Sequence, residues 1–89
     1  MVIVVKKCVA VFKSRTQVMA FKEIMNTRGV SCKLISTPKE AHVGCGVSAE
    51  FSQNNLNIAK TVVGSGRFSS FVGFFLIEKR GSHTTTARI

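Results

Sequence analysis

One short stretch near the middle of the chain carries the residues best suited to covalent chemistry. Residues 36–51 are "STPKEAHVGCGVSAEF", in which Cys45 stands between Gly44 and Gly46. Glycine permits positive φ, so the backbone N–H groups beside the cysteine can converge on one point and form an anion site. We expect such a site to stabilise a thiolate at Cys45, with Lys39 and His42 adding positive charge from upstream. The spacing alone leaves open the alternative that Cys45 only fills a tight turn.

The other two cysteines lie in apolar segments, which indicates a different role. Cys8 shares a predicted strand face with Ala10 and Phe12, and Cys32 lies in a second apolar segment. We expect both to be small core residues, although Cys32 would be a resolving thiol for Cys45 if the loop approached its strand. An odd number of cysteines in a chain without an export signal argues against a disulfide framework.

Other candidate sites are weaker. His42-x-x-Cys45 supplies two metal ligands, but a structural zinc site needs four, and the second histidine, His83, is far along the chain. Residues 64–67, Gly-Ser-Gly-Arg, resemble a phosphate loop but follow a predicted helix, so a helix end is favoured. The chain has no Asp and only four separated Glu, so we expect no catalytic base and no cofactor.

The charge of the chain favours acidic partners. Thirteen Lys and Arg stand against four acidic residues, a net charge of +9, but no basic run exceeds two residues. A nucleic-acid-binding module is therefore an alternative function, in which bases would stack on the rings near Arg67. The strand before the second helix lacks the aromatic pattern of RNA-recognition modules, so we expect these rings to pack in the core: Phe68, Phe71, Phe74 and Phe75.

Hydrophobic periodicity predicts the elements that must position Cys45. Strands are predicted at 2–12, 30–35, 46–51 and 71–77. Ser14 is the expected N-cap of a helix, with Gln17 completing a capping box, and Asn54 or Asn55 is the expected N-cap of a second helix. Gly73 marks a bulge or a close approach within the last strand.

This β-α-β-β-α-β order predicts an α+β fold of the ferredoxin-like type. Right-handed crossovers would give a four-stranded antiparallel sheet with both helices on one face. Residues 1–80 are expected to form a single domain, and residues 81–89, which lack periodicity, a disordered tail. The apolar runs 1–5 and 71–77 are too short to span a membrane and no signal-peptide pattern is present, so we expect a cytoplasmic protein without a membrane partner.

From the first helix to the glycine-flanked cysteine, the chain resembles a family of small bacterial proteins described as putative selenium/sulfur carrier protein-like, a domain of unknown function. The resemblance covers about residues 8–78, and its most specific part is the spacing from Pro38 to Cys45. The matching residues are Phe12, Ser14, Gly29-Val30, Leu34-Ile35, Pro38-Lys39 and Cys45-Gly46. Ser36, Arg15 and Lys22 depart from the residues that the family has at these positions.

The resemblance implies a carrier rather than an independent enzyme. Cys45 would hold sulfur or selenium as a persulfide or perselenide, with Lys39 as a charged neighbour. The implied partners are a cysteine desulfurase-type donor and a sulfur or selenium acceptor protein. The alternatives are a basic nucleic-acid-binding module and a regulatory protein-interaction module with a structural cysteine, in which the exposed edge of the second strand pairs with a partner or forms a homo-oligomer.

Overall fold

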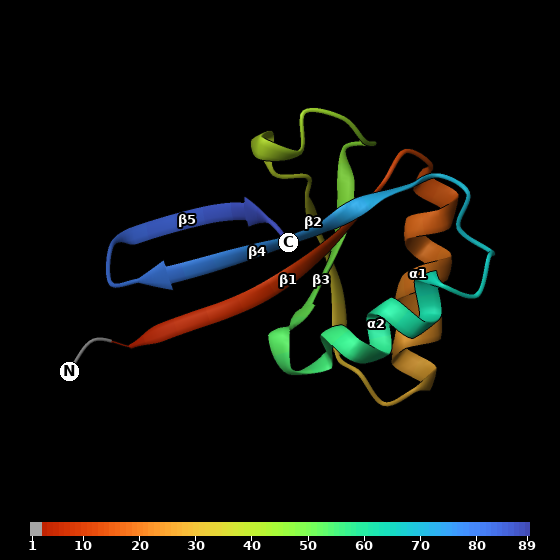
Figure 1. The fold of residues 1–89 in the computed structure, drawn as a ribbon, viewed down its shortest axis with the longest axis horizontal. Coiled ribbons are helices and arrows are strands. Elements are labelled where there is room, and N and C mark those ends of the chain that lie inside the picture. Colours follow the sequence, from red (N-terminus) through yellow and green to blue (C-terminus); the bar gives the residue numbers. More distant parts are fainter. Residues whose placement is uncertain (1–2) are drawn as a thin grey trace.

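The computed structural model describes residues 3–89, which form a five-stranded antiparallel sheet with two helices on one face (Figure 1). The elements, in chain order, are β1 (Val4–Phe12), α1 (Arg15–Thr27), β2 (Cys32–Ser36), η1 (Lys39–Ala41), β3 (Val47–Ser52), η2 (Gln53–Asn55), α2 (Leu56–Val63), β4 (Phe71–Arg80) and β5 (His83–Arg88), where η denotes a short 3-10 helix. The strand order is β2-β3-β1-β4-β5. The predicted start of the first strand, Val2, lies outside the described residues. Neither helix among residues 3–89 is long and apolar enough to cross a membrane.

The strand count and the C-terminal tail require correction. The order β2-β3-β1-β4 is compatible with the predicted ferredoxin-like arrangement, but β5 adds a fifth strand along the free edge of β4. This strand is made by residues expected to be a disordered tail. It is exposed on nearly all positions, so it lacks the alternation that predicts strands, although its three threonines favour extended structure. The guanidinium of Arg88 anchors it by donating to the Val72 carbonyl at 2.8 Å.

The start of α1 is tied to the start of β4. Ser14 is the N-cap as predicted, and its hydroxyl accepts from the Gln17 N–H at 3.3 Å. Gln17 does not complete the predicted capping box, because its side-chain oxygen accepts from Ser70 instead, from the N–H at 3.0 Å and from the hydroxyl at 2.7 Å. At the other end of the helix, Gly29 has the expected positive φ of 79°.

Asn55 stands at the N-cap of the second helix, as predicted, but the capping hydrogen bond comes from another residue. Ser52 caps η2 by accepting from the Asn54 N–H at 3.4 Å, and α2 begins at Leu56 as a continuation of that turn. Asn55 precedes the helix without a side-chain capping bond. The predicted helix is therefore present, but a serine two to three residues earlier starts it.

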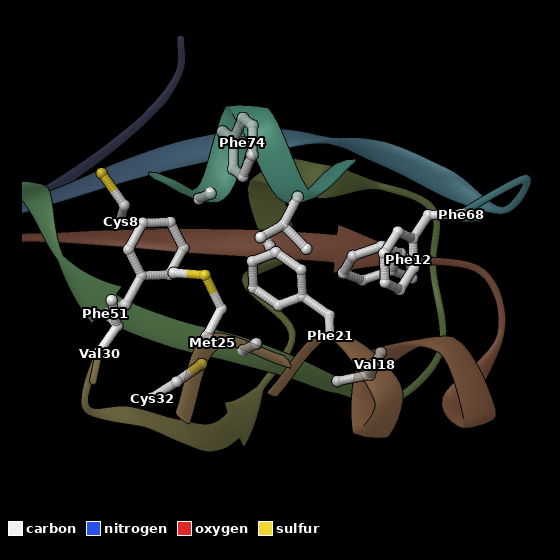
Figure 2. Close-up of a cluster of buried hydrophobic side chains, with 14 residues drawn as sticks. Cys8, Phe12, Val18, Phe21, Met25, Val30, Cys32, Phe51, Phe68 and Phe74 are labelled. Atoms are coloured by element: carbon white, nitrogen blue, oxygen red, sulfur yellow. The ribbon is translucent and has the colours of Figure 1, made fainter. Parts of the chain in front are cut away.

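The main core lies between the sheet and the two helices (Figure 2). It is built largely from phenylalanine rings whose centroids lie 4.8 to 6.1 Å apart, in tilted and edge-on contacts: Phe12, Phe21, Phe51, Phe68, Phe71 and Phe74. Cys8 and Cys32 are buried beside these rings, which confirms that they are core residues.

A second, smaller apolar cluster lies on the opposite face of the sheet. Because side chains alternate along a strand, Val9 and Val11 of β1 point away from the helices, where they pack with Phe75 of β4 and Ala41 of η1. All four are buried. We call Val9, Val11, Ala41 and Phe75 the outer cluster; it fixes η1, and with it the loop that carries Cys45, against the sheet.

Candidate functional site

The loop from β2 to β3 holds Cys45 at the rim of the sheet, beside the end of β1. The Cys45 N–H donates to the carbonyl of Phe12, the last residue of β1, at 3.0 Å. The Thr37 N–H donates to the Gly46 carbonyl at 3.3 Å, which joins the two ends of the loop. Cys45 therefore follows a backbone path that is bonded on both sides.

Thr37 is a second anchor that the sequence analysis missed. Its hydroxyl donates to the Cys45 carbonyl at 2.5 Å and lies 2.7 Å from the hydroxyl of Ser48. Since the Thr37 hydroxyl uses its one proton in the bond to Cys45, it accepts a hydrogen bond from the Ser48 hydroxyl. Ser48 is fully buried, so its end of this small network is shielded from water. No sequence motif identifies a threonine before a proline as an anchor of this kind, and the burial of its serine partner on β3 becomes known only from the fold.

The two glycines beside Cys45 differ in backbone conformation, and this difference bears on the expected anion site of converging N–H groups. Gly44 has φ of 120°, and a Cβ there would lie 2.8 Å from Cγ1 of Val11 and 3.2 Å from the Phe12 carbonyl oxygen. Gly46 has no positive φ and open space where a Cβ would point. Because the Cys45 N–H is already bonded to Phe12, Gly44 serves mainly a close approach of the loop to β1.

The Cys45 side chain is half-buried and hydrogen-bonded. Its S–H donates to the Val47 carbonyl at 3.0 Å, and the side chain packs against the edge of the main core. This bond requires the proton. Loss of the proton would bring the sulfur lone pairs against the carbonyl oxygen, so a thiolate would turn away from Val47 toward solvent.

A shallow cleft of about 350 Å³ opens at Cys45, and the predicted charged residues line it. Lys39 and His42 both contribute to its wall, together with Pro38 and the two glycines. His42 ends η1 with φ of 58°, a left-handed conformation that is uncommon for residues other than glycine. Among the described residues, neither Lys39 nor His42 hydrogen-bonds to Cys45, so the structure brings both to the cleft without a direct contact to the thiol.

The other two thiols lie in unreactive surroundings. Burial raises the pKa of Cys8, and burial raises the pKa of Cys32 to about 11 against the opposing charge of Lys22. Cys32 is the first residue of β2, and the Cys45 loop begins after Ser36, the last residue of β2. At about 3.3 Å per residue, the length of the strand places Cys32 about 13 Å from the start of that loop. Cys32 is therefore unsuited to be a resolving thiol for Cys45.

The remaining sequence candidates have structural roles. The Gly64 N–H donates to the Lys60 carbonyl at 2.9 Å, so residues 64–67 follow the end of α2 rather than open a phosphate loop. Phe68, Phe74 and Phe75 are buried, which removes them as stacking platforms for bases. In the part of the chain from residue 3 onward, no three His, Cys, Asp or Glu side chains gather as a metal site would require.

Comparison with known proteins identifies the family. The family model described as "Putative Se/S carrier protein-like" matches residues 7–69, from within β1 through the Cys45 loop and α2 to the loop that precedes β4. No curated protein and no solved structure matches the chain significantly. The match covers well over half of the sequence, including the whole of the cysteine loop, and the chain therefore belongs to the Putative Se/S carrier protein-like family.

Proposed function

We propose that this protein carries sulfur or selenium as a persulfide or perselenide on Cys45. One observation carries the proposal: of the three cysteines, Cys45 alone is partly exposed, and it opens into a cleft lined by Lys39 and His42. Family membership supports the same chemistry. The raised pKa values of Cys8 and Cys32 favour their thiol forms, which leaves Cys45 as the nucleophile.

Loading would be a thiol exchange at the outer sulfur of a donor persulfide. Cys45 loses its proton, and its sulfur attacks the terminal sulfur of R–S–SH; one S–S bond forms, the donor S–S bond breaks, and the donor leaves as a thiolate that takes up the proton. The products are Cys45–S–SH and R–SH, with no change in total oxidation level. A donor that bears R–S–SeH would load selenium by the same exchange.

His42 and Lys39 have complementary roles in this step. His42 lines the same cleft as Cys45, and a neutral imidazole nitrogen can accept a proton, so His42 would take the Cys45 proton in this step. The Lys39 ammonium would stabilise the negative charge that results on sulfur or on the persulfide. Loss of the hydrogen bond from the Cys45 S–H to the Val47 carbonyl frees the sulfur to turn into the cleft, where the donor would approach.

The experiment is persulfide loading followed by intact-mass measurement. The wild-type protein, Cys45→Ala and Cys32→Ala are each incubated with a cysteine desulfurase and cysteine, or with a selenocysteine lyase and selenocysteine. We expect the wild type and Cys32→Ala to gain the mass of one sulfur or selenium atom, and Cys45→Ala to gain none. Loading of Cys45→Ala at the wild-type level, or no loading of any form, would overturn the proposal.

The charge-driven alternative is tested in parallel. A nucleic-acid-binding module with net charge +9 would bind oligonucleotides with an affinity that falls steeply as salt rises. Three of the four rings predicted for stacking are buried, namely Phe68, Phe74 and Phe75, which disfavours base stacking and leaves binding through phosphates as the main form of this alternative. Under the carrier proposal, Cys45→Ala abolishes loading and leaves any such residual binding unchanged.

A further inference from the structure

A groove lies on the outer face of the sheet, beside the outer cluster. It has a volume of about 390 Å³ and crosses β2, β3, β1 and β4 on the face away from the helices. Its apolar part consists of Val5, Ile35 and Ile77. Val5 is 42% exposed, although valine on a sheet face is normally covered. We call this the outer groove.

The outer groove is also strongly basic. Lys7, Lys33 and Lys79 line it, against the single carboxylate of Glu50. Glu50 is already paired with Lys33, at 3.6 Å between the charged atoms. Lys7 and Lys79 have no ion pair among the described residues. Two uncompensated ammonium groups therefore border an apolar floor in which Val5 is exposed and Ile35 and Ile77 are half-buried.

The strand register arranges these groups in an alternating pattern. Lys7 of β1 lies opposite Ile77 of β4, and Val5 of β1 lies opposite Lys79 of β4. Each lysine is therefore next to an aliphatic side chain, both across the strands and along them. Residues two apart on an extended chain are separated by about 7 Å, the same spacing as Val5 and Lys7 or Ile77 and Lys79. An extended segment laid over this face can present carboxylates and aliphatic side chains in register with that pattern.

Other occupants fit this surface less well. A nucleic acid held through its phosphates would leave the aliphatic floor of the groove uncovered, and Phe75, the aromatic residue of the outer cluster, is only 3% exposed and offers no ring on which bases could stack. A second copy of this chain would bring another net charge of +9 against a basic groove. Charge complementarity and the aliphatic floor together select an acidic, aliphatic protein segment.

We propose that the outer groove binds an extended segment of a partner protein in which carboxylate and aliphatic side chains alternate on one face. The groove adjoins the Cys45 loop, because Ile35 packs on the outer cluster together with Ala41 of η1, and η1 also contributes Lys39 to the Cys45 cleft. The end of the groove at Ile35 is therefore the end nearer to η1, so a protein that supplies the bound segment would lie near the thiol. The proposal concerns binding and holds whether or not Cys45 carries sulfur.

The test uses a designed peptide and a protein that cannot be loaded. The probe is Glu-Ser-Val-Ser-Glu-Ser-Val-Ser-Glu, blocked at both ends, titrated into ¹⁵N-labelled Cys45→Ala protein at low salt. We expect the amide signals of Val5, Ile35 and Ile77 to shift. The double variant Lys7→Glu/Lys79→Glu should bind the probe about tenfold more weakly, because two exposed charge pairs are turned repulsive. The same variant should gain binding to the probe in which Lys replaces Glu.

Matched controls separate the groove from total charge. Lys60→Glu/Arg67→Glu makes the same change of net charge at two exposed positions in α2 and just after it, and should keep the wild-type affinity within about twofold. The probe with Ser in place of Val should bind more weakly, since it lacks the aliphatic contacts. Equal weakening in both double variants, equal binding of the Val-less probe, equivalent shifts with single-stranded DNA, or concentration-dependent dimerisation through the groove would each overturn the proposal.

Discussion

Gly44→Ala should destabilise the protein far more than Gly46→Ala, although the two glycines flank the same cysteine. Gly44 has φ of 120°, where a residue with a side chain is strained by about 1–3 kcal/mol. A new methyl group would also lie 2.8 Å from Cγ1 of Val11, well inside the carbon–carbon contact distance of about 3.5–4.0 Å. Val11 belongs to the buried outer cluster and cannot move freely, so overpacking adds about 1–3 kcal/mol.

The two contributions together predict a loss of about 2–6 kcal/mol in the free energy of unfolding. A chain of 89 residues has a total stability of about 4–13 kcal/mol, so Gly44→Ala removes a large part of it. Gly46→Ala adds a methyl group in open space at ordinary φ, and should range from neutral to about 1 kcal/mol more stable.

Urea denaturation of the wild type and the two variants measures this difference directly. The native-state alkylation rate of Cys45, measured well below the denaturation midpoint, is a second readout, because a displaced Gly44 moves the neighbouring thiol. Equal midpoints for the two variants would refute the argument that Gly44 alone serves the close approach to β1. A Gly44→Ala protein within about 0.5 kcal/mol of wild type would refute the contact itself.

Three further outcomes follow from other contacts. Burial raises the pKa of Cys32 to about 11 in the folded protein, so the contribution of the neutral thiol to stability is complete below the pKa of a free thiol and should be lost, by up to about 2–3 kcal/mol, as pH rises toward 11. Guanidinium denaturation at pH 8 and above pH 10 measures this loss. The variant Cys32→Ala should lack this part of the pH dependence. Thr37→Val leaves the Ser48 hydroxyl buried without its partner and should cost about 1–3 kcal/mol in urea denaturation, whereas Thr37→Ser should retain most of the stability. Arg88→Ala removes the hydrogen bond to the Val72 carbonyl, so the amide hydrogens that join β4 and β5 should exchange faster with solvent while those of β1 keep their protection. A uniform loss of protection across the sheet would contradict a local role for Arg88.

The part of the fold that buries apolar side chains on one face was predictable from periodicity. The first four strands and both helices follow from alternating or helical spacing of apolar residues, and Gly29 and Ser14 act at the helix ends as their chemistry predicts. β5 was missed because its side chains are exposed on both faces, so its stability comes from backbone pairing with β4 and from Arg88. Gly73 was recognised as a bulge or a close approach, and both apply: the register shifts between Val11 and Phe12, and the Arg88 guanidinium lies where a Cβ of Gly73 would point.

The candidate site was predictable in its residue types but not in its contacts. The spacing of Gly44, Cys45 and Gly46 suggested two equivalent glycines, while the structure distinguishes them by the proximity of β1, which is distant in the sequence. The Thr37–Ser48 network joins residues whose types are common in loops and strands, so nothing in the local sequence marks it. Long-range contacts of this kind require the fold to be known before they can be inferred.

The half-burial of Cys45 has a consequence for how a persulfide on it would react. An acceptor thiolate R–S⁻ can attack the outer sulfur of Cys45–S–SH, which yields R–S–SH and the Cys45 thiolate, or the inner sulfur, which yields the mixed disulfide R–S–S–Cys45 and HS⁻. The inner sulfur is the Cys45 Sγ, whose side chain packs against the edge of the main core, whereas the outer sulfur would extend one bond further, toward the open cleft. Access therefore favours attack on the outer sulfur and complete transfer of the cargo. Mass spectrometry of the loaded protein after addition of a small thiol should find free Cys45 and a persulfidated thiol; a predominant mixed disulfide at Cys45 would show that burial of Sγ does not direct the reaction.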